Sequence, residues 1–500
     1  MGVIIRQGFK ATAVTYFGVA LGALNLLFFF PKFLSAEEIG LREIIISVAM
    51  SLSIFTQLGL HSAMGRFFPY FKDEARQHNG FLLFCLVAAG GGFLLFGGLF
   101  YLLRYQVMAL FDANAAMVND FLWLVLPVTA LMMLQNIFEI WARLHFRIVV
   151  NALIREVFLR VSLTLLTLLY AFSYITFDQF MLLFGCTYLL AVVILIFYLR
   201  HLGVLYLQPK FVQIDPKLRP QLLRFSLWMM IGGAGVVINE RIDGIMLAWL
   251  AGLSMTGIYA ISFFIGTIID MPRRAVGQIA STLVAQQWKD GDFKAMGKLY
   301  KQASLNQLIL GGLFFILVWG NIDALFNLIP NGDVFRAGKW VVFFIGMARL
   351  VDMANGINSE IILNSPYYRF NLGSILFLGF ISFGTNYIMI PLYGLVGAAA
   401  GSTLSILLFN VVKGGFIYAK VGMQPFEKRT SQVVLLLLLC YGAGYFLPAA
   451  QSDFWSSVSN IALRSTVMGI LVVAGVYRFR LSDELHELLS KQLARFGKVK

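Results

Sequence analysis

A series of apolar stretches, each about twenty residues long, constrains this chain more than any other feature. A helix of about twenty apolar residues is long enough to cross the hydrocarbon core of a bilayer. Hydrophobic residues make up 59% of the 500-residue sequence and charged residues only 13%. The sequence therefore predicts an all-α polytopic membrane protein with about fourteen spans. The predicted spans cover residues 11–33, 41–63, 80–103, 119–142, 152–173, 178–199, 224–250, 254–272, 303–325, 338–361, 370–391, 394–417, 430–449 and 455–477.

The lysines and arginines predict the orientation of these spans. They gather in alternate loops, which the positive-inside rule assigns to the cytoplasm. The outer loops then keep only Lys32, Arg42, Arg104, Arg336 and Lys339. This asymmetry predicts an even number of spans with both ends of the chain in the cytoplasm. It also accounts for the net charge of +14 without nucleic-acid binding. Because the first apolar run lacks a small-residue cleavage site, we expect a membrane span there and not a removed signal peptide.

An internal repeat suggests how the spans are organised. A constant offset of 217 residues pairs Gly18 with Gly235, Gly40 with Gly257 and Lys72 with Lys289. The offset relates the first span to the seventh, so the two copies point the same way. The expected organisation is an N-terminal lobe of about six spans at 1–200, a cytoplasmic linker at 201–223, a C-terminal lobe of about six spans at 224–420, two additional spans at 421–478 and a cytoplasmic amphipathic tail at 479–500.

The stretch 224–257 carries charge inside an apolar run. A reading as two helices joined by an aqueous loop would leave a first span of about fourteen residues, which is too short to cross. We therefore predict one long helix, whose charges face a bundle interior or a wet cavity because lipid cannot accommodate them. The polar residues concerned are Asn239, Glu240, Arg241 and Asp243.

Other predicted spans carry ionisable groups as well. Arg349 and Asp352 are three residues apart, share one helix face and can pair with each other. Glu139 lies in the fourth span, with Arg143 one turn further toward the cytoplasm, and Arg66 ends the second span. Arg66 has an alternative explanation as a side chain that snorkels to the membrane surface. The deeper groups could likewise be ion pairs that only fix helix packing. Arg241 points away from the acids of its own helix, so it must find a partner on another helix or lie against backbone loosened by Gly232, Gly233 and Gly235.

Signatures of enzymes and of metal sites are missing. The sequence contains no GxxxxGK[ST] phosphate-binding loop, no HExxH and no nucleophile elbow. Cys85, Cys186 and Cys440 lie singly inside apolar runs, without the paired spacing of metal or redox sites. We expect neither catalysis nor a cofactor.

Two segments outside the spans have amphipathic character. Residues 286–302 mix aromatic side chains with lysines, and the tail from Leu481 repeats leucines at helical spacing after a possible N-cap at Ser482. We expect both to lie on the inner membrane surface in preference to binding a partner protein.

A short motif connects the chain to a known superfamily. Asp243 and Leu247 are followed by a short loop that ends in Gly257-x-Tyr259, and the first lobe opens with Phe33, Leu34 and Gly40. Together with the span plan, this resembles the multidrug/oligosaccharidyl-lipid/polysaccharide (MOP) exporter superfamily, in its Wzx-like polysaccharide flippase branch.

The resemblance implies transport of an undecaprenyl-pyrophosphate-linked oligosaccharide across the cytoplasmic (inner) membrane, through a central cavity that opens alternately to each side. Arginine offers a bidentate fork to pyrophosphate oxygens. The cavity candidates are Arg241 and Arg349, with Arg66 and Arg143 at the inner mouth; the supporting or coupling candidates, for a proton or sodium ion, are Asp243, Glu240, Asp352, Asn239 and Glu139. Implied partners are membrane lipids, a polysaccharide polymerase and glycosyltransferases.

Three alternatives remain open from the sequence. An ion-coupled multidrug exporter of the same superfamily would use the acids Glu139, Glu240 and Asp243, and a lipid II flippase would share the plan of spans. A scaffold that recruits glycosyltransferases without transport would make the charges within the spans purely structural.

Overall fold

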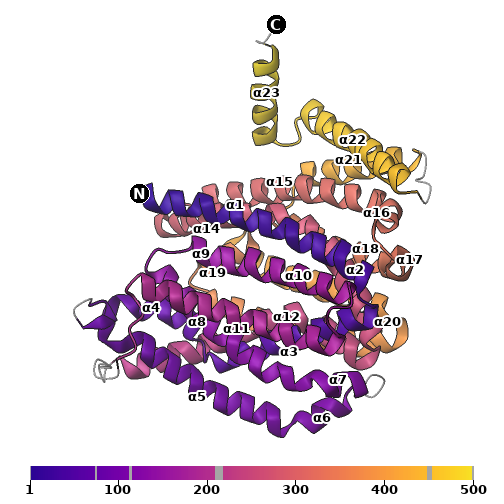
Figure 1. Cartoon of the computed structure of the whole chain (residues 1–500). Coiled ribbons are helices and arrows are strands. Elements are labelled where there is room, and N and C mark those ends of the chain that lie inside the picture. Colours follow the sequence, from indigo (N-terminus) through magenta and orange to yellow (C-terminus); the bar gives the residue numbers. More distant parts are fainter. Residues whose placement is uncertain (1, 74–75, 112–114, 209–217, 448–452, 498–500) are drawn as a thin grey trace. The chain divides into compact units, whose positions relative to one another are not determined.

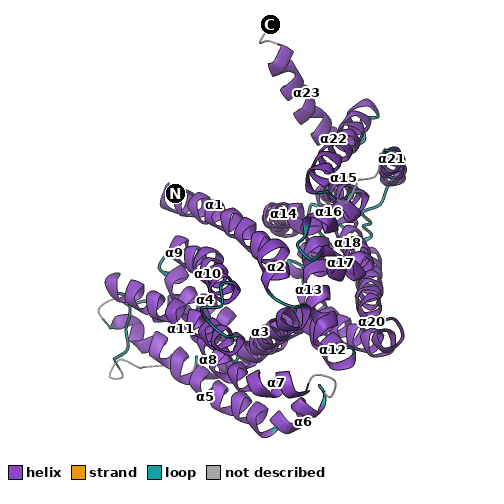
Figure 2. Ribbon diagram, turned by 45° about the vertical axis from the view of Figure 1, so that its right-hand side comes forward, coloured by secondary structure: helices purple, strands orange, loops and turns teal. Residues whose placement is uncertain are grey.

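The computed structural model describes residues 2–73, 76–111, 115–208, 218–447 and 453–497. Over these ranges the chain forms helices joined by loops, and no strand occurs in them (Figure 2). The predicted all-α fold class is confirmed.

Contacts between Cα atoms divide the chain into two compact units, Met1–Gly257 and Ile258–Lys500. The helices of the first unit are α1 (Gly2–Leu24), α2 (Phe30–Phe33), α3 (Ala36–Thr56), α4 (Leu60–Phe71), α5 (Phe81–Leu102), α6 (Arg104–Ala109), α7 (Ala115–Phe121), α8 (Val125–Leu144), α9 (Val149–Ala152), α10 (Leu159–Ala171), α11 (Phe177–His201) and α12 (Arg219–Leu250). Helix α13 (Leu253–Thr267) crosses the division. The second unit continues with α14 (Met271–Asp290), α15 (Phe293–Gly320), α16 (Ile322–Leu328), α17 (Gly332–Phe335), α18 (Lys339–Ala354), α19 (Asn358–Leu363), α20 (Tyr368–Val421), α21 (Lys428–Tyr445), α22 (Phe454–Arg478) and α23 (Asp483–Gly497), as Figure 1 shows.

Helix α12 is grouped with the N-terminal unit because it packs against α3 and α4. The expected C-terminal lobe, 224–420, includes most of α12, whereas the contacts assign this helix to the N-terminal unit. The lobes at 1–200 and 224–420 therefore remain a prediction. Within the expected linker, residues 209–217 lie outside the described residues.

Ten helices in the described ranges are long and apolar enough to cross a membrane by length and composition. One of them, α20, has 54 residues and joins two predicted spans. The predicted spans at 152–173, 338–361 and 430–449 are largely helical as well but fall short of these criteria. The chain is a multi-pass membrane protein, and the count of about fourteen spans stays a prediction.

Helix α12 tests the interpretation of the charged stretch directly. It runs without interruption from Arg219 to Leu250, with Pro220 in its first turn, where the missing N–H costs nothing. The chain leaves the helix through Gly252, which has a φ of +94°. The prediction of one long helix through Arg241 is confirmed.

Several long helices are interrupted at defined points. Gly394 has φ 56° and ψ −132°, so α20 is two helices that meet where the sequence placed a boundary, between residues 391 and 394. The predicted span at 338–361 is split into α18 and α19 by a turn at Gly356, with φ +63°. A π-helical turn at Leu153–Phe158 separates α9 from α10. Such irregularities free backbone groups and are frequent at functional sites.

Gly40 and Gly257, which the internal repeat pairs, contact each other in the first unit. A Cβ atom on Gly257 would lie 1.9 Å from the carbonyl oxygen of Ala36, and one on Gly40 would lie 2.0 Å from that of Leu253. Only glycine permits this approach of the two backbones. The structure therefore gives a packing reason for two glycines of the motif.

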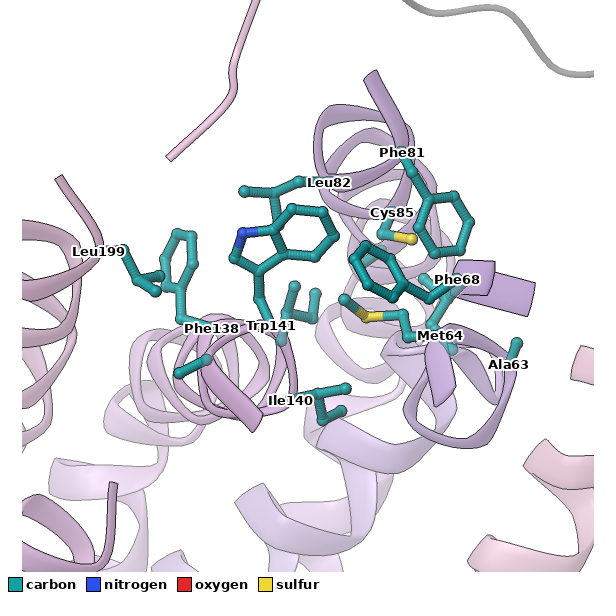
Figure 3. Packing of buried hydrophobic residues seen from close by; sticks show 14 of the residues in the cluster. Ala63, Met64, Phe68, Phe81, Leu82, Cys85, Phe138, Ile140, Trp141 and Leu199 are labelled. Carbon is teal, nitrogen blue, oxygen red and sulfur yellow. The ribbon is translucent and has the colours of Figure 1, made fainter. Parts of the chain in front are cut away.

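A cluster of buried side chains joins α4, α5, α8 and α11 in the first unit (Figure 3). Trp141 lies at its centre with 0% exposure, and its ring meets that of Phe68 edge-on at 5.4 Å between centroids. Its indole Nε1 donates a hydrogen bond of 2.8 Å to the carbonyl oxygen of Val204, which follows α11. The Trp141 side chain thus packs α8 against the neighbouring helices of the cluster and holds the segment that follows α11.

Replacing Trp141 with alanine should lower the free energy of unfolding by about 3–5 kcal/mol, because it opens a cavity and leaves the Val204 oxygen without its donor. The thermal unfolding midpoint of the purified protein in detergent measures this loss. Trp123, which is 55% exposed, is the matched control, and Trp123→Ala should change the midpoint little. Equal shifts for both variants would contradict the central role of Trp141.

Candidate functional site

The second unit contains a cluster of charged side chains around the break between α18 and α19. Asp352 lies in the last turn of α18, and Glu360 lies in α19 just beyond the break. A Cβ atom on Gly356 would lie 3.0 Å from the Ser304 backbone of α15, so the turn sits tightly against that helix. The break brings both acids to one place from a segment that was expected to be a single span.

Asp352 is bound by two residues from other helices. Its Oδ2 atom accepts a hydrogen bond from the Arg273 guanidinium of α14, and its Oδ1 atom accepts one of 3.1 Å from the Asn410 amide of α20. Arg273 also lies 3.8 Å from Asp270, just before α14. A carboxylate at a helix C-terminus faces an unfavourable dipole, so these donors are what stabilise its charge.

Lys413 and Glu360 complete the cluster. Lys413 is 2% exposed, and its ammonium group donates a hydrogen bond of 2.8 Å to the hydroxyl of Ser359. It interacts electrostatically with Asp352, Glu360 and Arg273. The Oε2 atom of Glu360 is buried and finds no hydrogen-bond donor in the described part of the chain. With acids at 270, 352 and 360 against Arg273 and Lys413, this set is one positive charge short of neutrality.

Arg349 does not pair with Asp352 as the sequence suggested. Its guanidinium lies 5.8 Å from the centroid of the Phe263 ring, and its Nε atom is buried without a hydrogen-bond partner. Within the described ranges, no carboxylate lies within 4.0 Å of it. The partner of Asp352 comes instead from α14, which spacing along one helix cannot reveal.

Arg241 has a partner on another helix, which is the first of the two alternatives that the sequence left open. Its Nη1 atom lies 3.9 Å from the Glu43 carboxylate of α3, and its Nη2 atom lies 3.4 Å from the sulfur of Met50. Glu43 also binds its neighbour Arg42 at 2.8 Å. Arg42, which the sequence placed in an outer loop, is buried in α3 with its guanidinium over the Phe30 ring. The Glu43 carboxylate therefore interacts with two arginines, so its single negative charge is shared between Arg42 and Arg241.

The acids near Arg241 on α12 are separated by the structure. Asp243 is 6% exposed, whereas Glu240 is exposed and Asn239 is half-buried. Of the two acids, Asp243 is therefore buried within the first unit and Glu240 is not.

Glu139 forms a third polar site, beside the π-helical turn. It is 4% exposed, accepts a hydrogen bond of 2.9 Å from Gln135 and lies 3.7 Å from the Arg155 guanidinium. Asn151 donates to the backbone oxygen of Glu139 at 2.8 Å, which ties α8 to α9. Arg143, one turn along α8, is exposed.

Arg66 lies on α4. It is exposed, and its guanidinium lies 4.4 Å from the Phe225 ring centroid. This contact agrees with the predicted place at a span end, and it leaves the charged head accessible.

Sequence reasoning missed Glu43, Arg273, Glu360 and Lys413. Lys413 interrupts the predicted span at 394–417 as plainly as Arg349 interrupts its own, so an inventory of all ionisable groups within spans would have found it. Glu43 and Arg273 lie near the ends of predicted spans, where charged residues are common. Their role in pairing can be recognised only when the helices that they contact are known.

Comparisons with known proteins agree with this architecture. Residues 5–280 match the model of a family described as polysaccharide biosynthesis protein. The fold is similar to that of the lipid II flippase MurJ in an inward closed conformation, with a TM-score of 0.71, 12% identity and coverage of 94% of this chain and 99% of that one. It is also similar to an inward-facing multidrug resistance MATE family transporter of the MOP superfamily, with a TM-score of 0.63, 12% identity and coverage of 80% of this chain and 94% of that one.

One curated relative is an uncharacterized membrane protein of Methanocaldococcus jannaschii, which is 24% identical over 324 residues. The chain matches 62% of the length of this relative. The matched family and folds are those of exporters and flippases, and not of enzymes.

Asp352→Asn should destabilise the protein by about 1–3 kcal/mol, since it leaves the partly buried Arg273 with only the more distant carboxylate of Asp270 at 3.8 Å. The double variant with Arg273→Gln should lose less than the two single variants together, because it removes both members of the pair. Thermal unfolding of the purified variants measures the coupling. Asp333→Asn is the control, since Asp333 is fully exposed and pairs only loosely with Arg336 at 3.8 Å. Additive losses would contradict the pairing.

Proposed function

This chain belongs to the polysaccharide biosynthesis protein family, and we propose from this premise that it carries a polyprenyl-pyrophosphate-linked oligosaccharide across the cytoplasmic membrane. Its fold is that of the MOP superfamily, which the motif around Asp243 and Gly257 predicted. Transport would follow alternating access, with the pyrophosphate held by cations in the protein and the polyprenyl chain in contact with lipid.

The observation that carries this proposal is a basic group without a carboxylate partner inside an apolar helix. An isolated arginine at such depth is costly unless an anion compensates it during function. Among the described residues Arg349 is such a group, and Arg241 shares the carboxylate of Glu43 with Arg42. Guanidinium groups bind phosphate oxygens in bidentate fashion, so both are suited to a pyrophosphate.

Exposed cations supply a path toward these groups. Arg66 and Arg143 are exposed, and the positive-inside rule places both at the cytoplasmic mouth. We propose that they attract the pyrophosphate of the substrate before it enters. Lys413 is buried beside Ser359 and would act deeper, by supporting the charge of Asp352.

The acids suit a coupling role. Among the described side chains of the cluster at Asp352, the three acids outnumber Arg273 and Lys413 by one, so a proton or sodium ion would bind there and be released as the substrate binds. Asp243, which is buried, and Glu139, which is held by Gln135 and Arg155, are further coupling candidates. Glu240 and Asn239 would support Arg241 from the same helix.

Buried acids also favour a second candidate, an ion-coupled multidrug exporter. Glu139 and Asp243 are enclosed, and a cationic drug would require such carboxylates. A lipid II flippase shares the fold, and a scaffold for glycosyltransferases would not need the charges within the spans for its role. The unpartnered Arg349 argues for an anionic substrate over a cationic drug.

Arg349→Gln should reduce exposure of lipid-linked oligosaccharide on the outer leaflet by about tenfold or more, since it removes a charge-assisted contact to phosphate. Export is measured in cells by labelling the outer-leaflet glycan, after the abundance of the variant in the membrane has been verified. Arg349→Lys should retain part of the activity, because it keeps the charge and loses the fork.

Arg104→Gln is the matched control, because Arg104 lies on the surface and bonds only to Tyr101 and Tyr105 beside it. Normal export by an abundant Arg349→Gln variant would overturn the proposed substrate site. A scaffold role predicts that outcome for every substitution of a charge within the spans.

A further inference from the structure

A pocket of about 470 Å³ lies in the second unit, away from the charged cluster at Asp352. Its walls come from the first turns of α15 and from the end of α20 with the residues that follow. The lining residues are Phe293, Lys294, Gly297, Lys298, Lys301, Tyr418, Gly422, Met423 and Gln424. The proposed transport cycle assigns no role to them.

The charged residues that line this pocket are all positive. Lys294, Lys298 and Lys301 follow the i, i+4, i+7 spacing that puts residues on one face of a helix, and no acid lines the pocket. None of the three lysines forms an ion pair in the described ranges. The nearest acid along α15, Asp292, is engaged in capping the helix, since it accepts the N–H of Ala295 at 2.9 Å. Like charges at this spacing repel each other, so the pocket is complementary to an anion.

The base of the pocket is formed by a side chain that is packed in a buried cluster. Met423 is 8% exposed and belongs to a buried cluster with Met296, Tyr300 and Ile417. Gly297 lies directly above it, since a Cβ atom there would sit 3.4 Å from the Met423 sulfur. The hydroxyl of Tyr418 and the amide of Gln424 add hydrogen-bond donors at the edge. The lysines therefore converge on a defined hollow.

The position of the pocket indicates the source of the anion. Helices α15 and α20 are both candidate membrane spans, and the pocket lies where one begins and the other ends, which is the level of lipid headgroups. Its lysines place it on the cytoplasmic side by the positive-inside rule. Phe293 is 45% exposed and Tyr418 is 63% exposed, as is typical of aromatic side chains at a membrane surface.

We propose that this pocket binds the phosphate headgroup of an anionic phospholipid of the inner leaflet. The ammonium groups of Lys294, Lys298 and Lys301 contact the phosphate oxygens, while Phe293 and Tyr418 lie against the glycerol and the start of the acyl chains. Basic pockets between helices on the cytoplasmic side bind anionic headgroups in this way. The proposal does not depend on which substrate the protein transports.

Native mass spectrometry of the purified full chain with phosphatidylglycerol tests this site. We expect one tightly retained lipid per chain and much weaker retention of phosphatidylcholine. Lys294→Gln, Lys298→Gln and Lys301→Gln together should weaken binding of phosphatidylglycerol by about a hundredfold, since each lysine contributes about fivefold and the three contributions multiply. If the triple variant does not fold, Lys298→Gln alone should still show about a fivefold loss.

A matched control removes the same charge elsewhere. Lys72, Lys289 and Lys428 are exposed and do not line the pocket, so their combined replacement by glutamine should leave binding within about twofold. Gly297→Leu fills the hollow without removing a lysine and should weaken binding as the triple variant does.

Three results would overturn the proposal. The first is unchanged binding in the triple variant, and the second is an equal loss in the control, which would indicate adsorption to the whole basic surface. The third is displacement of the lipid by millimolar inorganic phosphate together with stabilisation of lipid-free protein by phosphate, which would assign the pocket to a soluble anion.

Discussion

The cost of holding charge in an apolar environment governs this structure. A buried ion is tolerated only when a partner or a ligand compensates it, and removal of one partner is more damaging than removal of both. Asp352 accepts from Arg273 and Asn410, and Glu43 binds Arg42 and lies near Arg241. These pairs link α14, α18 and α20 in one unit and α3 with α12 in the other. We propose that a substrate anion binds at the exceptions to complete pairing among the described residues, above all at Arg349.

Interruptions of the helices position these charges. Glu360 and Asp352 reach one cluster because Gly356 turns the chain between α18 and α19. Glu139 meets Arg155 because the latter lies in a π-helical turn. A helix that is already broken can reorient one half without losing further hydrogen bonds, so charge pairing and movement are compatible at these points. At Asp352 and at Glu139, irregular backbone and charge therefore coincide, whereas Asp243 is buried in the unbroken helix α12.

Hydropathy was sufficient to predict the fold class, the unbroken helix through Arg241 and the boundary near Gly394, because each depends on local composition. Cross-helix partners could not be predicted, since Glu43 with Arg241 and Arg273 with Asp352 are brought together only by packing. Spacing along one helix suggested that Arg349 pairs with Asp352, but in the packed structure Asp352 pairs with Arg273 of α14. Lys413 was visible as a charge within an apolar run and needed no structure to be recognised.

Reconstitution of the purified full chain in vesicles tests the central claim most directly. Undecaprenyl-pyrophosphate-linked oligosaccharide with a fluorescent label is placed in the membrane, and the fraction accessible to an impermeant quencher is followed with time. The account predicts translocation well above that of empty vesicles, slowed about tenfold or more in Arg349→Gln. Failure to move this lipid, or an equal rate for an analogue without phosphate, would contradict it.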